Sequence, residues 1–159
     1  MSGMAGKFDK LQQFNVQPRE DGKYKVGLDS DKFEVVKHLK PVFAFDYLCE
    51  DASAFSFTGG LMGAADYRKL MKGLKRISQN TYETLNREEQ FHFHDVKWQD
   101  VSVKESDFNK CIFGTGESNG DLTPYQVKVF EKARLIGFLY RGVFYMVMFD
   151  RGHNAYKRK

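Results

Sequence analysis

The chain has 159 residues, enough to bury a core without disulfide bonds or a bound metal, and it most simply forms one domain. No stretch approaches the ~20 apolar residues of a membrane span, and two widely spaced cysteines fit neither a disulfide scaffold nor a zinc finger. The net charge of +4 permits an acidic partner such as RNA. We therefore expect a cytoplasmic protein with Cys49 and Cys111 reduced, a single disulfide between them being the alternative.

The first 40 residues are polar and charged, and they predict an N-terminal extension or a small hairpin. Within them, residues 31–39 are typical of a helical turn that Pro41 ends. Residues 41–159 are predicted to form a single α+β domain.

Residues 42–48 begin this domain with an alternating aromatic pattern. Phe43, Phe45 and Tyr47 occupy every second position, which predicts a strand with three rings on one face. A second short strand is predicted over residues 55–57.

The next segment has the apolar spacing of a helix. An apolar stripe with intervals of three and four residues predicts an amphipathic helix over residues 67–77. Its members are Tyr67, Leu70, Met71, Leu74 and Ile77. Asn80, followed three residues later by Glu83, predicts the N-cap of a short helix over residues 81–88.

The remaining chain predicts mostly strands. Residues 91–98 alternate, with Phe91 and Phe93 on one face and His92 and His94 on the other. Residues 99–121 are rich in Gly, Ser, Asn and Asp and predict a loop, with a short strand over 111–113. Further strands are predicted over 126–130, 135–140 and 143–149, the last two joined by an Arg-Gly turn. The fold class is therefore α+β, an antiparallel sheet of about five strands packed against one long and one short helix.

The end of the chain carries a recognisable motif. It reads Gly-Phe at 137–138, Val-Phe-Tyr-x-Val at 143–147 and Asp-x-x-His-x-x-Tyr at 150–156, and residues 94–98 read His-Asp-Val-Lys-Trp. These residues resemble a family of short bacterial proteins of uncharacterised function, over about residues 40–159, with a departure at Lys97, where the family has an acidic residue. More distantly, the order of elements is similar to RelE/ParE-type ribonuclease toxins, which implies an activity on RNA.

A candidate catalytic group follows from these residues. Metal-free RNA cleavage needs a base, an acid and a cation for the phosphorane charge. His94 and His153 could transfer protons, and Arg134 or Arg141 could hold the phosphate. Asp150 could orient an imidazole, and Tyr156 could orient or stack. The alternative is that His153 and Tyr156 cap the last strand and Asp150 makes a turn.

A two-histidine pattern raises the question of a metal site. His92 and His94 share one face of the predicted strand, and Asp150 or His153 could add a third ligand. The alternative is an exposed pair beside an aromatic face. We therefore predict no metal and no cofactor.

The predicted helix carries a basic face. Its members are Arg68, Lys69, Lys72, Lys75 and Arg76. They could follow a phosphate backbone, the alternative being a solvated helix face. The leading hypothesis is a small RNA-binding protein, with metal-independent ribonuclease activity of the toxin kind. The competing hypothesis is a non-enzymatic module, phage- or defence-associated, that binds a cognate protein through the helix or the 99–121 loop. The sequence predicts no membrane contact and leaves the oligomeric state open.

Overall fold

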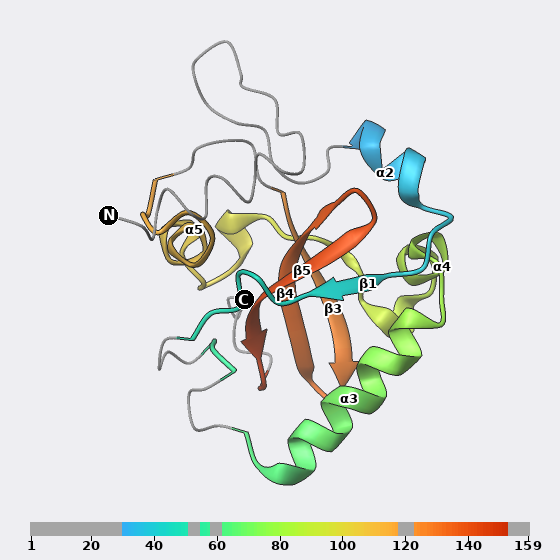
Figure 1. The fold of residues 1–159 in the computed structure, drawn as a ribbon, viewed down its shortest axis with the longest axis horizontal. Helices are drawn as coiled ribbons and strands as arrows, with labels where there is room; N and C mark the ends of the chain where they lie inside the picture. The colour runs from blue at the N-terminus through green and yellow to red at the C-terminus, as the bar shows by residue number, and fades with distance from the viewer. Residues whose placement is uncertain (1–29, 51–54, 58–61, 118–122, 153–159) are drawn as a thin grey trace.

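The fold is that of a computed structural model, which describes residues 30–50, 55–57, 62–117 and 123–152, with side chains from Phe33 onward. Five strands form one sheet in the order β1-β5-β4-β3-β2. They are β1 (Val42–Ala44), β2 (His94–Asp95), β3 (Pro124–Phe130), β4 (Ala133–Tyr140) and β5 (Val143–Asp150). β1 pairs with β5 in parallel and every other pairing is antiparallel, so the α+β class with a mostly antiparallel sheet is confirmed (Figure 1).

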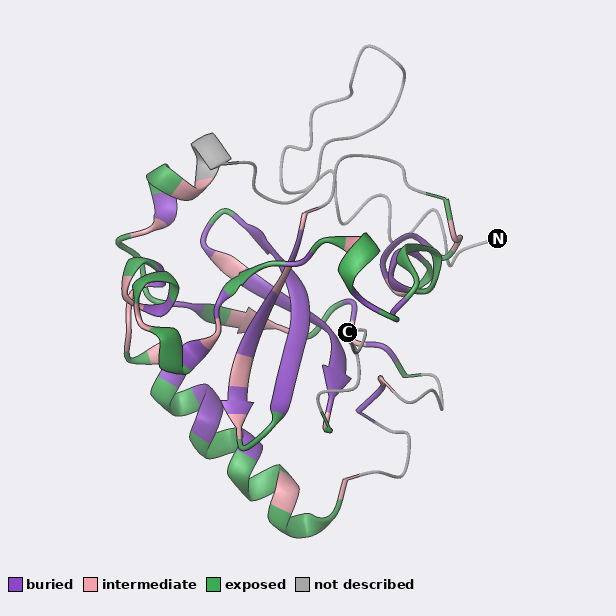
Figure 2. Ribbon diagram, turned by 180° about the vertical axis from the view of Figure 1, so that it is seen from behind, coloured by how far each residue is buried: buried purple, intermediate pink, exposed green. Residues whose placement is uncertain are grey.

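The hairpin of β4 and β5 lies at the centre of the sheet. Nearly every residue of both strands is buried, because each strand is covered on both faces (Figure 2). Arg141 and Gly142 connect the strands with φ angles of 52° and 82°. Two successive left-handed residues are what a type I′ hairpin turn requires, so the predicted Arg-Gly turn is confirmed.

Two hydrophobic cores lie on opposite faces of the sheet. The alternation along β4 sends Leu135 and Leu139 into one core and Ile136 and Phe138 into the other. The first core is closed by α3 (Ala64–Ser78), α4 (Tyr82–Arg87) and the 3-10 turn η1 (Glu89–Phe91). The second is closed by α5 (Glu105–Phe113), with η2 (Trp98–Asp100) beside it.

Helix α3 confirms the predicted amphipathic helix. It packs against β3 more closely than large side chains at the point of contact would allow. A Cβ atom on Gly73 would overlap the carbonyl oxygen of Val129 in β3. The helix backbone therefore lies directly on the strand, with Leu70, Leu74 and Ile77 buried beside the contact. Met71, predicted in the stripe, is 65% exposed.

Helix α4 begins one residue later than the sequence suggested. Thr81 is the N-cap, since its Oγ1 accepts a hydrogen bond from the Thr84 backbone N at 3.2 Å. The predicted cap, Asn80, instead donates from Nδ2 to the carbonyl of Arg76, at the end of α3. The N-terminus of α4 is also tied to the chain after α2 (Ser30–Val36), because Glu83 N donates to Lys37 O at 2.8 Å.

The prediction of strands over residues 42–48 and 55–57 is wrong in extent. Pairing with β5 ends at Ala44, and the chain turns at Asp46 and Tyr47. Phe43 packs on one core and Tyr47 on the other, while Phe45 is 57% exposed, so the three rings do not share a face. Residues 55–57 form a turn, although Phe55 O accepts a hydrogen bond from Phe149 N.

Residues 91–121 differ most from expectation. Of the strand predicted over residues 91–98, all of which the structure describes, His94 and Asp95 alone are strand. Phe91 ends the 3-10 turn η1, and His92 adopts a left-handed conformation with φ 44°, so the backbone is not extended there. The predicted loop contains helix α5, which buries Phe108 and Ile112 completely and ends at left-handed Gly114. The short strand expected at 111–113 is therefore the last turn of this helix.

Three further predictions concern the N-terminal segment, membrane spans and the cysteines. The hairpin expected before residue 30 lies outside the described residues. In the described part, no helix has the length and apolar character needed to cross a membrane. Cys49 and Cys111 are both free thiols.

Candidate nucleic-acid interface

An open groove of about 390 Å³ lies along the contact between α3 and β3. Its charged walls are Lys69, Lys72 and Arg76 from the helix and Lys128 from the strand, with Glu131 at one end. Four basic residues and one acidic residue therefore line the groove. A groove of this volume is within the range that holds small ligands, and its charge selects anions.

The local structure explains why the groove exists. Positions 69, 72 and 76 recur at intervals of three and four, so the three cations lie on one side of α3. Gly73 forms the floor, because it has no side chain to fill the space above β3. The guanidinium carbon of Arg76 lies 5.2 Å from the centre of the Phe91 ring, which holds the charge at the groove wall by a cation–π contact.

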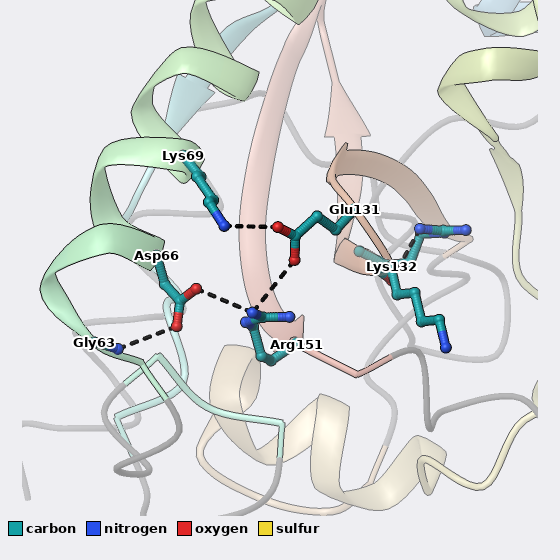
Figure 3. A network of polar contacts seen from close by, with 7 residues as sticks. Gly63, Asp66, Lys69, Glu131, Lys132 and Arg151 are labelled. Atoms are coloured by element: carbon teal, nitrogen blue, oxygen red, sulfur yellow. Dashed lines mark hydrogen bonds and ion pairs between the residues drawn. The ribbon is translucent and has the colours of Figure 1, made fainter.

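A network of ion pairs closes one end of the groove (Figure 3). Lys69 Nζ lies 2.6 Å from Glu131 Oε1, and Arg151 Nη2 lies 3.5 Å from Glu131 Oε2. The same Arg151 atom donates to Asp66 Oδ1 at 3.0 Å. Asp66 Oδ2 accepts from the N-cap amide of α3, Gly63 N, at 3.2 Å. The network thus joins the start of α3, the β3–β4 turn and the end of β5.

The network also sets the ionisation of its two carboxyl groups. Hydrogen bonds from Arg151 and Gly63 hold the pKa of Asp66 below its ordinary value. The hydrogen bond and charge of Lys69 do the same for the pKa of Glu131. Both groups are therefore ionised at neutral pH, and Glu131 neutralises part of the charge of Lys69.

The five basic residues predicted on the helix divide into two sets. Lys69, Lys72 and Arg76 line the groove, whereas Arg68 and Lys75 are exposed and do not. Lys128 and Gln90 line the groove with them but were not predicted. In the sequence, Lys128 alternates with Val127 and Val129, which indicates a strand residue that does not join the two valines in the core. The sequence gives no indication that α3 lies beside this strand.

The predicted proton-transfer residue His94 is exposed, but both of its ring nitrogens are engaged. Nδ1 lies 2.7 Å from the Asp95 carbonyl oxygen, so it must carry the proton. Nε2 then accepts from Gln126 Nε2, at 2.9 Å. A base at this position would have to break the hydrogen bond from Gln126 first.

The other predicted catalytic residues are placed as follows. Arg134 and Asp150 are both buried and are paired across β4 and β5. Arg134 Nη1 donates to the carbonyl of Lys132 at 2.9 Å, so its guanidinium holds the β3–β4 turn. Arg141 lies just beyond the opposite end of β4 from Arg134, about 23 Å away at ~3.3 Å per strand residue. His153 and Tyr156 lie outside the described residues, so their predicted roles stay predictions.

The hypothesis of a metal site at His92 and His94 can be compared with the described residues, which do not include His153. Among the residues whose positions are described, no three or more His, Cys, Asp or Glu side chains are grouped so that they could hold an ion. The left-handed backbone of His92 also removes the common strand face on which the two-ligand hypothesis depended.

The chain was compared with protein families, curated proteins and solved structures. No protein-family model, curated protein or solved structure matches the chain.

Proposed function

We propose that this protein binds single-stranded RNA through the groove between α3 and β3. The observation that carries the proposal is the convergence of Lys69, Lys72, Arg76 and Lys128, from two elements far apart in sequence, on one open groove. Positive side chains that follow a phosphate backbone supply most of the affinity in nucleic-acid binding. An open groove admits a chain, whereas an enclosed cavity would admit only a small anion.

Single-stranded RNA fits the groove better than a duplex. Among the described residues, the basic side chains of the groove come from one helix and one strand and border a hollow, which suits a single strand that enters it. The resemblance to RelE/ParE-type toxins implies the same ligand class. The free thiols of Cys49 and Cys111 support a reducing, cytoplasmic setting. Ribonuclease activity remains a prediction, which depends on His94 and on His153.

Fluorescence anisotropy with a labelled decanucleotide RNA tests the proposal. The variant Lys72→Gln/Lys128→Gln removes two charges from the groove, and affinity should fall by about tenfold. The matched control, Arg68→Gln/Lys75→Gln, removes two charges from α3 outside the groove, and affinity should change less than about twofold. Equal losses in the two variants would show that the binding follows net charge and not the groove.

A poly-glutamate peptide of equal charge separates RNA from an acidic protein partner. We expect the peptide to compete poorly with the decanucleotide. If the peptide binds as tightly as RNA, the interaction-module hypothesis replaces this one.

A further inference from the structure

Glu131 brings a negative charge to the wall of a groove that is otherwise basic. Its Oε1 accepts a hydrogen bond from Lys69 Nζ at 2.6 Å, and both residues line the groove (Figure 3). Its Oε2 lies 3.5 Å from Arg151 Nη2. Lys69 therefore already contacts an anion of the same chain, at the ammonium group that would otherwise contact a phosphate.

The connection between β3 and β4 does not itself require a glutamate. Glu131 and Lys132 join the two strands, and Glu131 has a φ of 46°. Glycine and asparagine adopt this left-handed conformation more readily than glutamate does. The backbone therefore gives no reason for a carboxylate at this position, and the contacts of the side chain must supply one.

The ion pair between Lys69 and Glu131 contributes little to the stability of the fold. The two side chains are 46% and 50% exposed, so water and salt screen their attraction. Arg151 also keeps a closer partner, because it lies 3.0 Å from Asp66. The pair can therefore open at a small cost, with the carboxylate of Glu131 turning toward solvent.

Glu131 nevertheless carries its full charge at neutral pH. The hydrogen bond and the charge of Lys69 hold the pKa of Glu131 below its ordinary value. The carboxylate is therefore ionised under the conditions in which RNA would bind, and it attracts the same cation as a phosphate does.

We infer that the carboxylate of Glu131 is an internal competitor for Lys69, which a phosphate of the RNA strand must displace. This inference rests on the proposed function. A single phosphate only exchanges one anion for another at Lys69. A strand also contacts Lys72, Arg76 and Lys128, and these contacts offset the displacement. Glu131 thus lowers the affinity of the groove and selects ligands with several phosphates over a single anion.

Two variants of Glu131 test this competition with the labelled decanucleotide. Glu131→Gln keeps the length of the side chain and removes its charge, and Glu131→Asn places a residue that tolerates the left-handed conformation. We expect both to bind about threefold to fivefold more tightly than the wild type. The slope of log Kobs against log salt should become steeper by about 0.7, because one more phosphate is neutralised. Damage to the fold would weaken binding, so a gain is a readout that a structural role would not produce.

Glu34 provides the matched control. Its Oε2 lies 2.8 Å from Lys37 Nζ in an exposed pair at the end of α2, and neither residue is among the described residues that line the groove. Glu34→Gln removes the same charge from a similar pair. Its affinity should change less than about twofold, with an unchanged slope.

The cost of losing Lys69 gives an independent measure of the competition. Lys69→Gln should weaken binding less than about twofold while Glu131 is present. In the Glu131→Gln background the same change should weaken binding about threefold to fivefold, because Lys69 is then available to a phosphate. Equal costs in the two backgrounds would show that Glu131 does not compete for Lys69.

The outcomes separate this inference from the proposed function. Unchanged or weaker binding in both Glu131 variants, or loss of their fold by circular dichroism, gives Glu131 a structural role and overturns the inference, while the wild type still binds through the groove. An equal gain in Glu34→Gln assigns the effect to net charge and also overturns it. If neither the wild type nor Glu131→Gln binds the decanucleotide, the proposed function fails and the inference fails with it.

Discussion

Replacing Gly73 by alanine tests the close contact on which the groove depends. The added Cβ would overlap Val129 O and lie 2.9 Å from the Val129 carbonyl carbon, against 3.4 Å for ordinary contact. The helix must therefore move from the strand by at least about 0.5 Å. Both contacting atoms belong to the β3 backbone, which is fixed by its pairing with β4 and cannot rotate away as a side chain could.

The expected change in the free energy of unfolding of Gly73→Ala is the difference between two opposing effects. Alanine gains ~1 kcal/mol over glycine in a helix interior, and overpacking costs up to ~3 kcal/mol. We expect a net loss of ~2 kcal/mol in the free energy of unfolding. With a urea m-value of about 2 kcal/mol/M, the midpoint of unfolding followed by circular dichroism falls by about 1 M.

Gly63 provides the matched control. It is the N-cap of the same helix, and a Cβ there would meet nothing within 4 Å. Gly63→Ala should therefore cost less than ~1 kcal/mol. Stabilisation by Gly73→Ala of ~1 kcal/mol, as helix propensity alone predicts, would refute the close approach of α3 to β3.

Three further changes test the fold. Tyr82→Phe removes the donor to Gly142 O, a bond of 2.8 Å, and should cost ~1–2 kcal/mol in urea unfolding because that carbonyl loses its partner. Hydrogen bonds from Arg151 and Lys69 hold the pKa values of Asp66 and Glu131 below their ordinary values, so the two carboxylates stabilise the fold fully at pH values above that ordinary range. Stability should fall as the pH drops further, and less steeply in Asp66→Asn/Glu131→Gln; identical acid profiles would contradict the network. Thr81→Ala should lower the free energy of unfolding by ~1 kcal/mol, as measured by thermal unfolding. An unchanged stability would show that Thr81 is not the N-cap of α4.

The central hairpin could be predicted because its sequence is locally consistent. Residues 133–140 and 143–150 are long apolar runs, and Arg-Gly between them suits two left-handed residues. The same holds for α3, where the apolar spacing extends over several turns.

Helix α5 could not be predicted because its local propensity is weak. Its sequence, ESDFNKCIF, contains several poor helix formers, and Phe108 and Ile112 are its two fully buried residues. Tertiary burial of that pair therefore stabilises the helix. The spacing of the two residues by four positions and the glycine at 114 were the available signals.

The strand predicted over residues 91–98 was wrong in extent because the burial of Phe91, His92 and Phe93 alternates although these residues do not form a strand. Phe91 and Phe93 are buried and His92 is not, as a strand would give. The left-handed φ of His92 produces this alternation instead. Three groove cations were predicted from their helical spacing. Lys128 depends instead on the contact between α3 and β3, which joins Gly73 to Val129, 56 positions later in the sequence.

The salt dependence of RNA binding tests the central claim most directly. Three to four cations of the groove predict a slope of log Kobs against log salt of about −2 to −3, at about −0.7 for each neutralised phosphate of a single strand. Lys72→Gln/Lys128→Gln should reduce the slope by about 1.4, and Arg68→Gln/Lys75→Gln should leave it unchanged. Equal slopes in the wild type and the groove variant, or an equal reduction in the control, would contradict RNA binding in the groove between α3 and β3.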